Sequence, residues 1–309
     1  MDAAAIDRRK VRRDKLLREI PLYIMLIPAV IVTLIWSYGP MFGLRMAFTR
    51  FSLARGIFGS EWTGLDNVRT LISMPNFWPV VRNTVGISLA NMILMIIVPV
   101  TFSLLLNEVK NMGLKRGLQT MVFLPNFISW IILSSLFIDI LSPSTGVVNQ
   151  MFGWVGISPI FFLGEQFWFP ITMVATNVWR SFGFGSVIYL AALSSIDPNL
   201  YEAAEIDGAN RWKQTINVTL PGMKPTIVLL SVLAMGGILN AGFDQIVNMY
   251  NPAVFATGDV LDTWIFRMGI QGAQWSLSAA MGFFRSVVSL IFVVMSYYLA
   301  DKLAGYKIF

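Results

Sequence analysis

The 309-residue chain is unusually apolar and weakly charged. Hydrophobic residues make up 56% of it and charged residues only 13%, with a net charge of +6, whereas soluble domains carry about 25% charged residues. The absence of cysteine and histidine excludes disulfides, Cys/His metal sites and catalysis by Ser-His or Cys-His pairs. The basic residues gather mostly in one tail, so the net charge does not indicate nucleic-acid binding.

Six long apolar stretches predict membrane-spanning helices, since each is close to the length that crosses a bilayer. They cover approximately residues 22–48, 83–106, 118–141, 167–193, 223–250 and 277–300. Neither an internal repeat nor a separate soluble region is apparent. The sequence therefore predicts an all-α membrane protein, with a basic tail at 1–20 and one six-helix domain at 21–309.

The first stretch follows the basic tail DRRKVRRDKLLR. Its apolar run continues past Pro40 to about Phe48, which is longer than the core of a signal peptide, and no small-residue cleavage site follows. An uncleaved first span is therefore expected, with the tail in the cytoplasm.

The distribution of lysine and arginine supports the same topology. Fifteen of these residues lie in the tail and in or beside segments 107–117, 194–222 and the C-terminal end, against five in the segments on the other side. Because cytoplasmic loops carry the excess of basic residues, both termini are expected in the cytoplasm. Arg45, Arg180 and Arg285 are left at membrane depth.

Residues 197–221 interrupt the apolar stretches with a short charged segment. Asp197 and Pro198 are typical of the N-cap and first residue of a helix, and Gly208 is typical of a left-handed stop. A second short helix is expected from about Asn210 to before Pro221. The pattern alone fits either a helix on the membrane surface or a docking element for another protein.

The residue order of this segment is more specific. Glu-Ala-Ala is followed after three residues by glycine, and after nine more by an aliphatic residue, one residue and Leu-Pro; these are Glu202, Ala203, Ala204, Gly208, Val218, Leu220 and Pro221. The pattern resembles the cytoplasmic loop motif of ABC importer permeases, with Val218 where that family usually has isoleucine. The surrounding YLAALSSIDPNLYEAAEIDGANRW resembles the sugar-importing, maltose-type branch. GVVNQMFGWVGISPIFFL and DVLDTWIFRMGIQGAQWSLSAAMGFFRSVVSL resemble permeases for polysaccharide fragments.

The resemblance covers roughly residue 20 to the end and implies a type I ABC importer permease fold, with a coupling helix in loop 194–222. It assigns the contact with the ATPase to Glu202, Ala203, Ala204, Gly208, Leu220 and Pro221. GLKRGLQT lacks the order of a phosphate-binding loop, so ATP and Mg are expected on separate ATPase subunits and the chain is not expected to be an enzyme.

The partners that the resemblance implies are a second, different permease chain, two ATPase subunits, a solute-binding protein outside the cell, and lipid. The implied location is the cytoplasmic membrane of a bacterium.

Polar and aromatic residues at membrane depth predict a sugar pathway, because such residues are costly in lipid and usually face a cavity. The candidates are Trp130, Asn177, Trp179, Arg180, Asn240, Asp244, Asn248 and Arg285. Asn240, Asp244 and Asn248 recur every four residues, which would make one stripe on a helix. The alternative is helix packing, with Arg180 paired to Asp244. FGFGS at 182–186 is interpreted as close helix packing rather than a phosphate loop.

The favoured function is the membrane subunit of an ATP-driven oligosaccharide importer, and the arginines at membrane depth suggest an acidic, uronate-type sugar such as alginate or pectin fragments. An ion-coupled secondary transporter is the alternative; it usually shows internal symmetry and acidic relays. A membrane scaffold would not need a polar stripe.

Overall fold

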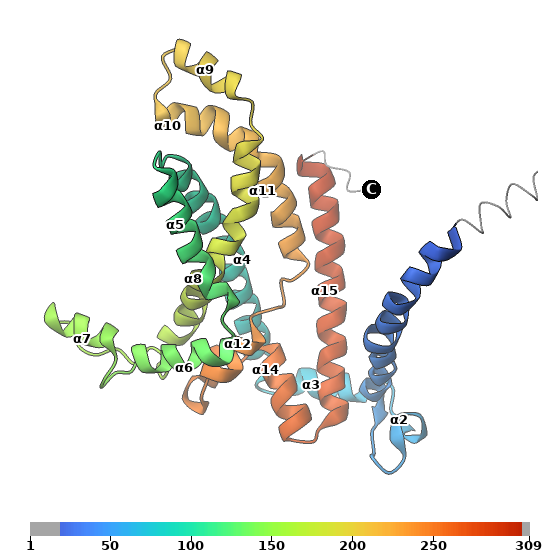
Figure 1. The fold of residues 1–309 in the computed structure, drawn as a ribbon. Coiled ribbons are helices and arrows are strands. Elements are labelled where there is room, and N and C mark those ends of the chain that lie inside the picture. The colour runs from blue at the N-terminus through green and yellow to red at the C-terminus, as the bar shows by residue number, and fades with distance from the viewer. Residues whose placement is uncertain (1–18, 305–309) are drawn as a thin grey trace, which may run out of the picture.

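The computed structural model describes residues 19–304, which are mostly helical (Figure 1). The first helix, Glu19–Phe48, includes η1 (Leu34–Tyr38) and η2 (Gly39–Phe48). A small antiparallel ribbon pairs β1 (Thr49–Arg50) with β2 (Glu61–Trp62). The other elements are α2 (Gly56–Gly59), α3 (Asp66–Ser73), α4 (Phe77–Asn107), α5 (Met112–Phe123), η3 (Leu124–Phe127), α6 (Trp130–Ile140), α7 (Val147–Trp154), α8 (Trp168–Ser194), α9 (Pro198–Ile206), α10 (Arg211–Gln214), η4 (Thr215–Thr219), α11 (Leu220–Met235), α12 (Phe243–Met249), η5 (Pro252–Val254), α13 (Phe255–Gly258), α14 (Leu261–Phe266), η6 (Arg267–Gln271) and α15 (Trp275–Ala304).

Four helices within residues 19–304 are long and apolar enough to cross a membrane: Glu19–Phe48, Phe77–Asn107, Arg211–Met235 and Trp275–Ser296. A fifth span results if Met112–Phe127 and Trp130–Ile140 are taken together, although these helices meet at 103°. The chain is thus a multi-pass membrane protein. The helix α8 has 27 residues but is less apolar than these.

The pair α4 and α8 forms the centre of the bundle. Ile87 on α4 lies in one buried cluster with Phe169 and Met173 on α8, and with Ile246 and Met249 on α12. A second cluster joins the C-terminal end of the first helix to α3, α14 and α15. Burial of these side chains, each worth about 1.5–3 kcal/mol when transferred from water, fixes the elements that surround the candidate site.

The third apolar stretch is not one straight helix. The η3 turn carries Pro125, which has no backbone N–H to continue the ladder, and Ile128 and Ser129 are extended. Ser129 then caps α6, its hydroxyl accepting from the amide of Ile132 at 3.5 Å. The prediction of a single span at 118–141 is therefore wrong at the bend, and α6 runs across the end of α5 (Figure 1).

The fifth stretch also differs from its prediction. The helix starts at Arg211 and runs through the π-helical turn η4 and Pro221 without a break, so the prediction of a short helix that ends before Pro221 is wrong. It ends at Met235, and residues 236–242 form turns that include Gly242 at φ +90°. Asn240 lies in these turns and Asp244 begins α12, so the predicted stripe on one helix is wrong.

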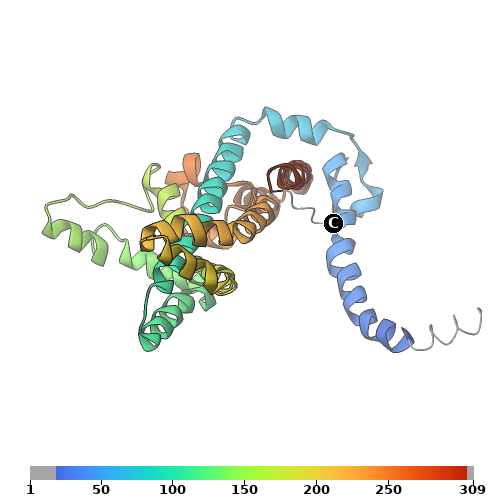
Figure 2. The same cartoon turned by 90° about the horizontal axis from the view of Figure 1, so that it is seen from above.

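The first helix stands apart from the bundle (Figures 1 and 2). Nearly all of its side chains from Glu19 to Phe42 are exposed. Within the described residues it is packed at its C-terminal end, where the Phe48 ring lies 5.0 Å from that of Phe283 and 5.6 Å from that of Trp62. The predicted basic tail lies, apart from its last two residues, outside the described residues.

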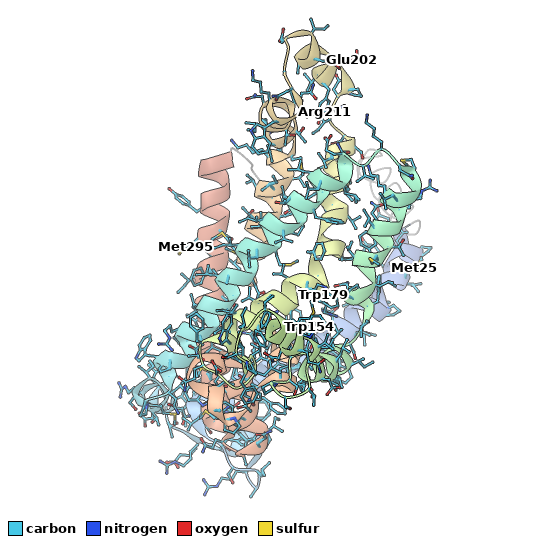
Figure 3. The ribbon with its side chains drawn as sticks, turned by 90° about the vertical axis from the view of Figure 1, so that its left-hand side faces the viewer. Met25, Trp154, Trp179, Glu202, Arg211 and Met295 are labelled. Atoms are coloured by element: carbon cyan, nitrogen blue, oxygen red, sulfur yellow. The ribbon has the colours of Figure 1, made fainter. Side chains whose placement is uncertain are left out.

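The two ends of the bundle carry different elements. One end holds α9, α10, the start of α5 and the end of α15, and the other holds α2, α3, α6, α7 and α14 (Figure 1). Figure 3 places Glu202 and Arg211 at the first end and Trp154 near the second, with Trp179 between them.

Close packing of α8 on α5 should depend on Gly183. A Cβ added there would lie 2.1 Å from the carbonyl oxygen of Val122, which confirms the interpretation of FGFGS as a packing motif. We expect Gly183→Ala to lower stability by about 1–3 kcal/mol through overpacking, measured as a fall in the melting temperature of the purified transporter. The control is Gly117→Ala on α5, where an added Cβ meets nothing within 4 Å; equal melting temperatures for the two variants would contradict this account.

Candidate functional site

The helix α9 is built as a short, well-defined projection. Asp197 caps its start, with the carboxylate accepting from the amide of Asn199 at 3.0 Å. At its end Gly208 has φ +75°, and the amide of Ala209 donates to the carbonyl of Ala204 at 2.9 Å. The predicted start and stop are thus confirmed. Left-handed backbone is costly for residues with a Cβ, which explains the glycine.

Side-chain packing holds the residues that flank this projection against the bundle. A Cβ on Gly222 of α11 would lie 2.8 Å from Cδ1 of Ile196, which shows how closely the chain entering α9 approaches α11. Met223 is fully buried in a cluster with Tyr189 and Leu193 of α8. The hydroxyls of Tyr201 and Thr219 are 3.0 Å apart. The residues that flank α9 are thus packed at the end of the bundle, whereas α9 itself has no buried residue and contacts the stem through Tyr201.

The residues predicted to contact an ATPase fall into two groups. Glu202, Ala203 and Gly208 are exposed on α9 and its stop, and Ala204 is half-buried. Leu220 packs against the cluster at the base, beside the exposed Pro221, so these two residues lie in the stem rather than on the projection.

Two exposed apolar residues beside this motif were not singled out by the sequence. Ile206 is 87% exposed and Trp212 is 71% exposed, although both lie in a polar environment at the end of the bundle. The sequence did carry a signal for both residues, because each is a large apolar side chain next to a helix break. Large apolar side chains that are exposed usually mark an interaction surface.

A cavity of about 530 Å³ lies between α9, α10 and the end of α4. Its lining includes the carboxylates of Glu108, Glu202 and Glu205 and the guanidinium of Arg211. The balance of these charges is negative, so the cavity suits a basic side chain.

A second cavity, of about 630 Å³, lies between α6, the turns before α12, α14 and α15. It brings together four of the predicted pathway residues: Trp130, Asn240, Asp244 and Arg285. Phe243, Asp262, Phe266, Trp275 and Ser278 also line it. Aromatic faces combined with carboxylates and amides match the surface of a sugar, whose rings stack and whose hydroxyls hydrogen-bond.

Charge in this cavity is partly compensated. Arg285 forms an ion pair with Asp262, while Asp244 is exposed at the start of α12 and makes no ion pair among residues 19–304. Burial raises the pKa of Asp262, and Arg285 beside it acts in the opposite direction. Asp262 escaped the sequence analysis because it lies outside the apolar stretches.

Arg180 does not pair with Asp244, so that alternative is wrong. Its guanidinium donates to the carbonyls of Asn126 at 3.1 Å and Ile128 at 3.2 Å, and it lies 5.0 Å from the centre of the Trp130 ring. These carbonyls lie at the break between α5 and α6, where the helical ladder is interrupted. Arg180 thereby fixes the break and the orientation of Trp130 toward the cavity.

The remaining predicted pathway residues lie elsewhere. Asn177 donates to the side-chain oxygen of Asn91 on α4 at 2.9 Å, which is an interhelical bond. Trp179 packs edge-on against Phe137, with ring centres 5.6 Å apart. Asn248 donates to the carbonyl of Asp244 at 2.6 Å and is exposed. The helix-packing interpretation holds for Asn177.

No group of three or more metal-ligating side chains occurs within the part of the chain that the structure describes.

Comparison with known proteins places the chain in a family. The family model of the binding-protein-dependent transport system inner membrane component matches residues 3–305. A polygalacturonan/rhamnogalacturonan transport system permease protein of Bacillus subtilis (strain 168) is 36% identical over 304 residues, which are 98% of this chain and 95% of that protein. A lactose transport system permease protein of Rhizobium radiobacter is 31% identical over 230 residues, 73% of this chain and 74% of that protein.

Solved structures agree with these matches. A chain in the crystal structure of a bacterial ABC transporter involved in the import of the acidic polysaccharide alginate is 38% identical, with a TM-score of 0.87 over 95% of this chain and 99% of that one. A second structure, of a bacterial alginate ABC transporter in complex with an alginate pentasaccharide-bound periplasmic protein, gives the same identity and TM-score. The matches confirm the resemblance and favour the importer permease over the ion-coupled carrier. The chain belongs to the family of inner membrane components of binding-protein-dependent transport systems.

Proposed function

We propose that this chain is the membrane-spanning subunit of an ATP-driven importer that moves an acidic, uronate-containing oligosaccharide from a binding protein into the cytoplasm. The observation that carries the proposal is the exposed, capped helix α9, whose flanking residues Ile196 and Leu220 pack against α8 and α11. Support for the substrate class comes from the relatives, whose names refer to polygalacturonan and alginate. Hydrolysis of ATP would take place on separate ATPase subunits, which bind the nucleotide and Mg.

The topology that suits this function has six crossings, formed by the first helix, α4, α5 with α6, α8, α11 and α15. As the fourth crossing, α8 would be tolerated despite its polar residues, because Asn177 and Arg180 are satisfied within the bundle. The α9 end and both termini would face the cytoplasm, consistent with the basic residues at that end.

In this arrangement α9 acts as the coupling helix. Its small residues Ala203 and Ala204 would let it lie close against a groove of the ATPase, while Glu202 and the adjacent cavity would receive a basic side chain through charge-assisted hydrogen bonds. Movement of the ATPases would then shift α8 and α11 as rigid elements. The turns at 236–242, which connect α11 to the second cavity, would change the shape of that cavity.

The exposed apolar side chains of the first helix provide a surface for the second permease chain. Its apolar side chains are uncovered along most of its length, and within the described residues it is packed at its C-terminal end. A second permease chain with its own bundle would cover one side of this helix and complete the pathway, and lipid would cover the rest.

Sugar recognition would take place in the second cavity. Trp130 and Trp275 supply ring faces for pyranose stacking, and Asn240 and Asp244 supply hydrogen-bond partners for hydroxyls. Arg285 lines this cavity and would bind a uronate carboxylate, which would compete with Asp262 for the guanidinium.

Coupling through α9 should fail in two variants. Glu202→Lys removes charge-assisted bonds worth about 1.5–3 kcal/mol, and Gly208→Leu strains a left-handed residue by roughly 1–2 kcal/mol. We expect each variant to lower ATP-dependent uptake of oligogalacturonate in proteoliposomes by about ten-fold or more. Binding of the ATPase should weaken in parallel. The control is Lys213→Gln on α10, which removes a charge from the same end; unchanged uptake in both test variants would refute the assignment of α9.

The role of Asp244 can be separated from that of a structural residue. Because its carboxylate is exposed and unpaired within residues 19–304, Asp244→Ala should leave assembly and basal ATP hydrolysis unchanged. Uptake should fall by about ten-fold, the equivalent of a lost hydrogen bond to a charged group. Asn248→Ala, one turn further along α12, is the matched control. Dissociation of the complex in Asp244→Ala would assign the residue to packing instead.

A further inference from the structure

A third cavity, of about 650 Å³, is a groove on the surface of the bundle between α4 and α8. It shares no lining residue with the two cavities described above. Its lining is almost wholly apolar apart from Arg82, Asn83 and Thr257 at one end. The groove is thus open to the surroundings of the protein rather than to the candidate sugar site.

Small residues over a packed floor create this groove. Gly86, Ala90 and Ala175 line it, and a Cβ built on Gly86 meets nothing within 4 Å. Beneath them Ile87 and Val174 are only 3% and 8% exposed and belong to the main buried cluster. The floor is therefore rigid, and the hollow is a property of the helix pair rather than of a loose loop.

The groove has the length and direction of a lipid chain. Arg82, Gly86, Ala90 and Leu94 all line the groove and recur every four residues, so they form a row that winds slowly around α4. Arg82 and Leu94 are separated by about 18 Å along the helix axis. One leaflet of the hydrocarbon core is about 15 Å thick, so the groove runs through one leaflet.

A cation stands at the mouth of the groove. The guanidinium of Arg82 is held by the carbonyl of Ala256 at 3.2 Å and by the side-chain oxygen of Asn83 at 3.1 Å. Both bonds use Nη2, and Nε donates to the same Asn83 oxygen at 3.4 Å. Among the described residues, the two N–H groups of Nη1 are thus left to an outside acceptor. Within residues 19–304 no carboxylate lies within ion-pair distance of Arg82. Trp78, 61% exposed one turn away, suits the depth of lipid headgroups.

We propose that this groove binds a phospholipid, with one acyl chain lying between α4 and α8 and the phosphate bound by Arg82. Arginine is well suited to phosphate because its N–H groups form a planar fork. The Gly86-x-x-x-Ala90 spacing would also allow a second transmembrane helix to pack here. An apolar helix, however, would bring no anion to Arg82. A phospholipid supplies both an acyl chain for the apolar groove and a phosphate for Arg82. The inference requires only that α4 and α8 span the membrane, and it is independent of the sugar.

Photochemical labelling tests the proposal on the assembled transporter, with its second permease and its ATPases, in nanodiscs. The probe is phosphatidylglycerol with a photoreactive group in its acyl chain, and the labelled peptides are identified by mass spectrometry. We expect labels within residues 82–94 and 170–175. Arg82→Gln should reduce this labelling about five-fold, the equivalent of about 1 kcal/mol for one charge at an anionic lipid, and Gly86→Trp should reduce it to background.

Matched controls are Arg69→Gln on α3, an exposed arginine whose ion pair within residues 19–304 is with Asp66, and Gly117→Trp on α5, where an added Cβ also meets open space. Both should keep normal labelling. Undiminished labelling of the groove in Gly86→Trp would overturn the proposal. If that variant fails to assemble, a photoreactive amino acid at Ile171 on the groove's rim decides: crosslinks to lipid support the proposal, and crosslinks to the second permease overturn it.

Discussion

The packed junction between the residues that flank α9 and the helices α8 and α11 is the contact on which the proposed coupling depends. Ile196 against Gly222, the buried Met223 and the hydroxyl pair of Tyr201 and Thr219 join one exposed helix to α8 and α11. A loosely attached loop would absorb an applied displacement, whereas interdigitated side chains resist it. The same two helices lead toward the second cavity, α8 through Arg180 and α11 through the turns at 236–242. One junction therefore connects two sites at different ends of the molecule.

Some polar groups inside the bundle form hydrogen bonds between helices, and others line a cavity where they can bind a substrate. Asn177 bonds to Asn91, and Arg180 satisfies the carbonyls at the break between α5 and α6. Each such group would cost several kcal/mol if it faced lipid unpaired. Asp244, in contrast, is exposed at a cavity. The distinction explains why helices with polar residues can serve both as scaffold and as lining in one membrane domain.

Sequence reasoning succeeded where local chemistry decides the outcome. The cap at Asp197, the left-handed Gly208 and the Glu-Ala-Ala pattern depend on neighbouring residues alone, and the family they suggested is confirmed. It failed where tertiary contacts decide. The stripe of Asn240, Asp244 and Asn248 assumed an unbroken helix, but glycines at 236, 237 and 242 permit turns there. The partner of Arg285 was missed because Asp262 is 23 residues away on a short helix, and no local pattern links the two.

The most direct test of the account is the accessibility of Ile206, which is 87% exposed at the end of α9. The chain has no cysteine, so Ile206→Cys provides a single reactive site for a membrane-impermeant maleimide. The account predicts no labelling in intact cells, labelling in inverted membrane vesicles stripped of the ATPase, and protection when the ATPase is added back. Labelling of intact cells, or equal labelling with and without the ATPase, would contradict it.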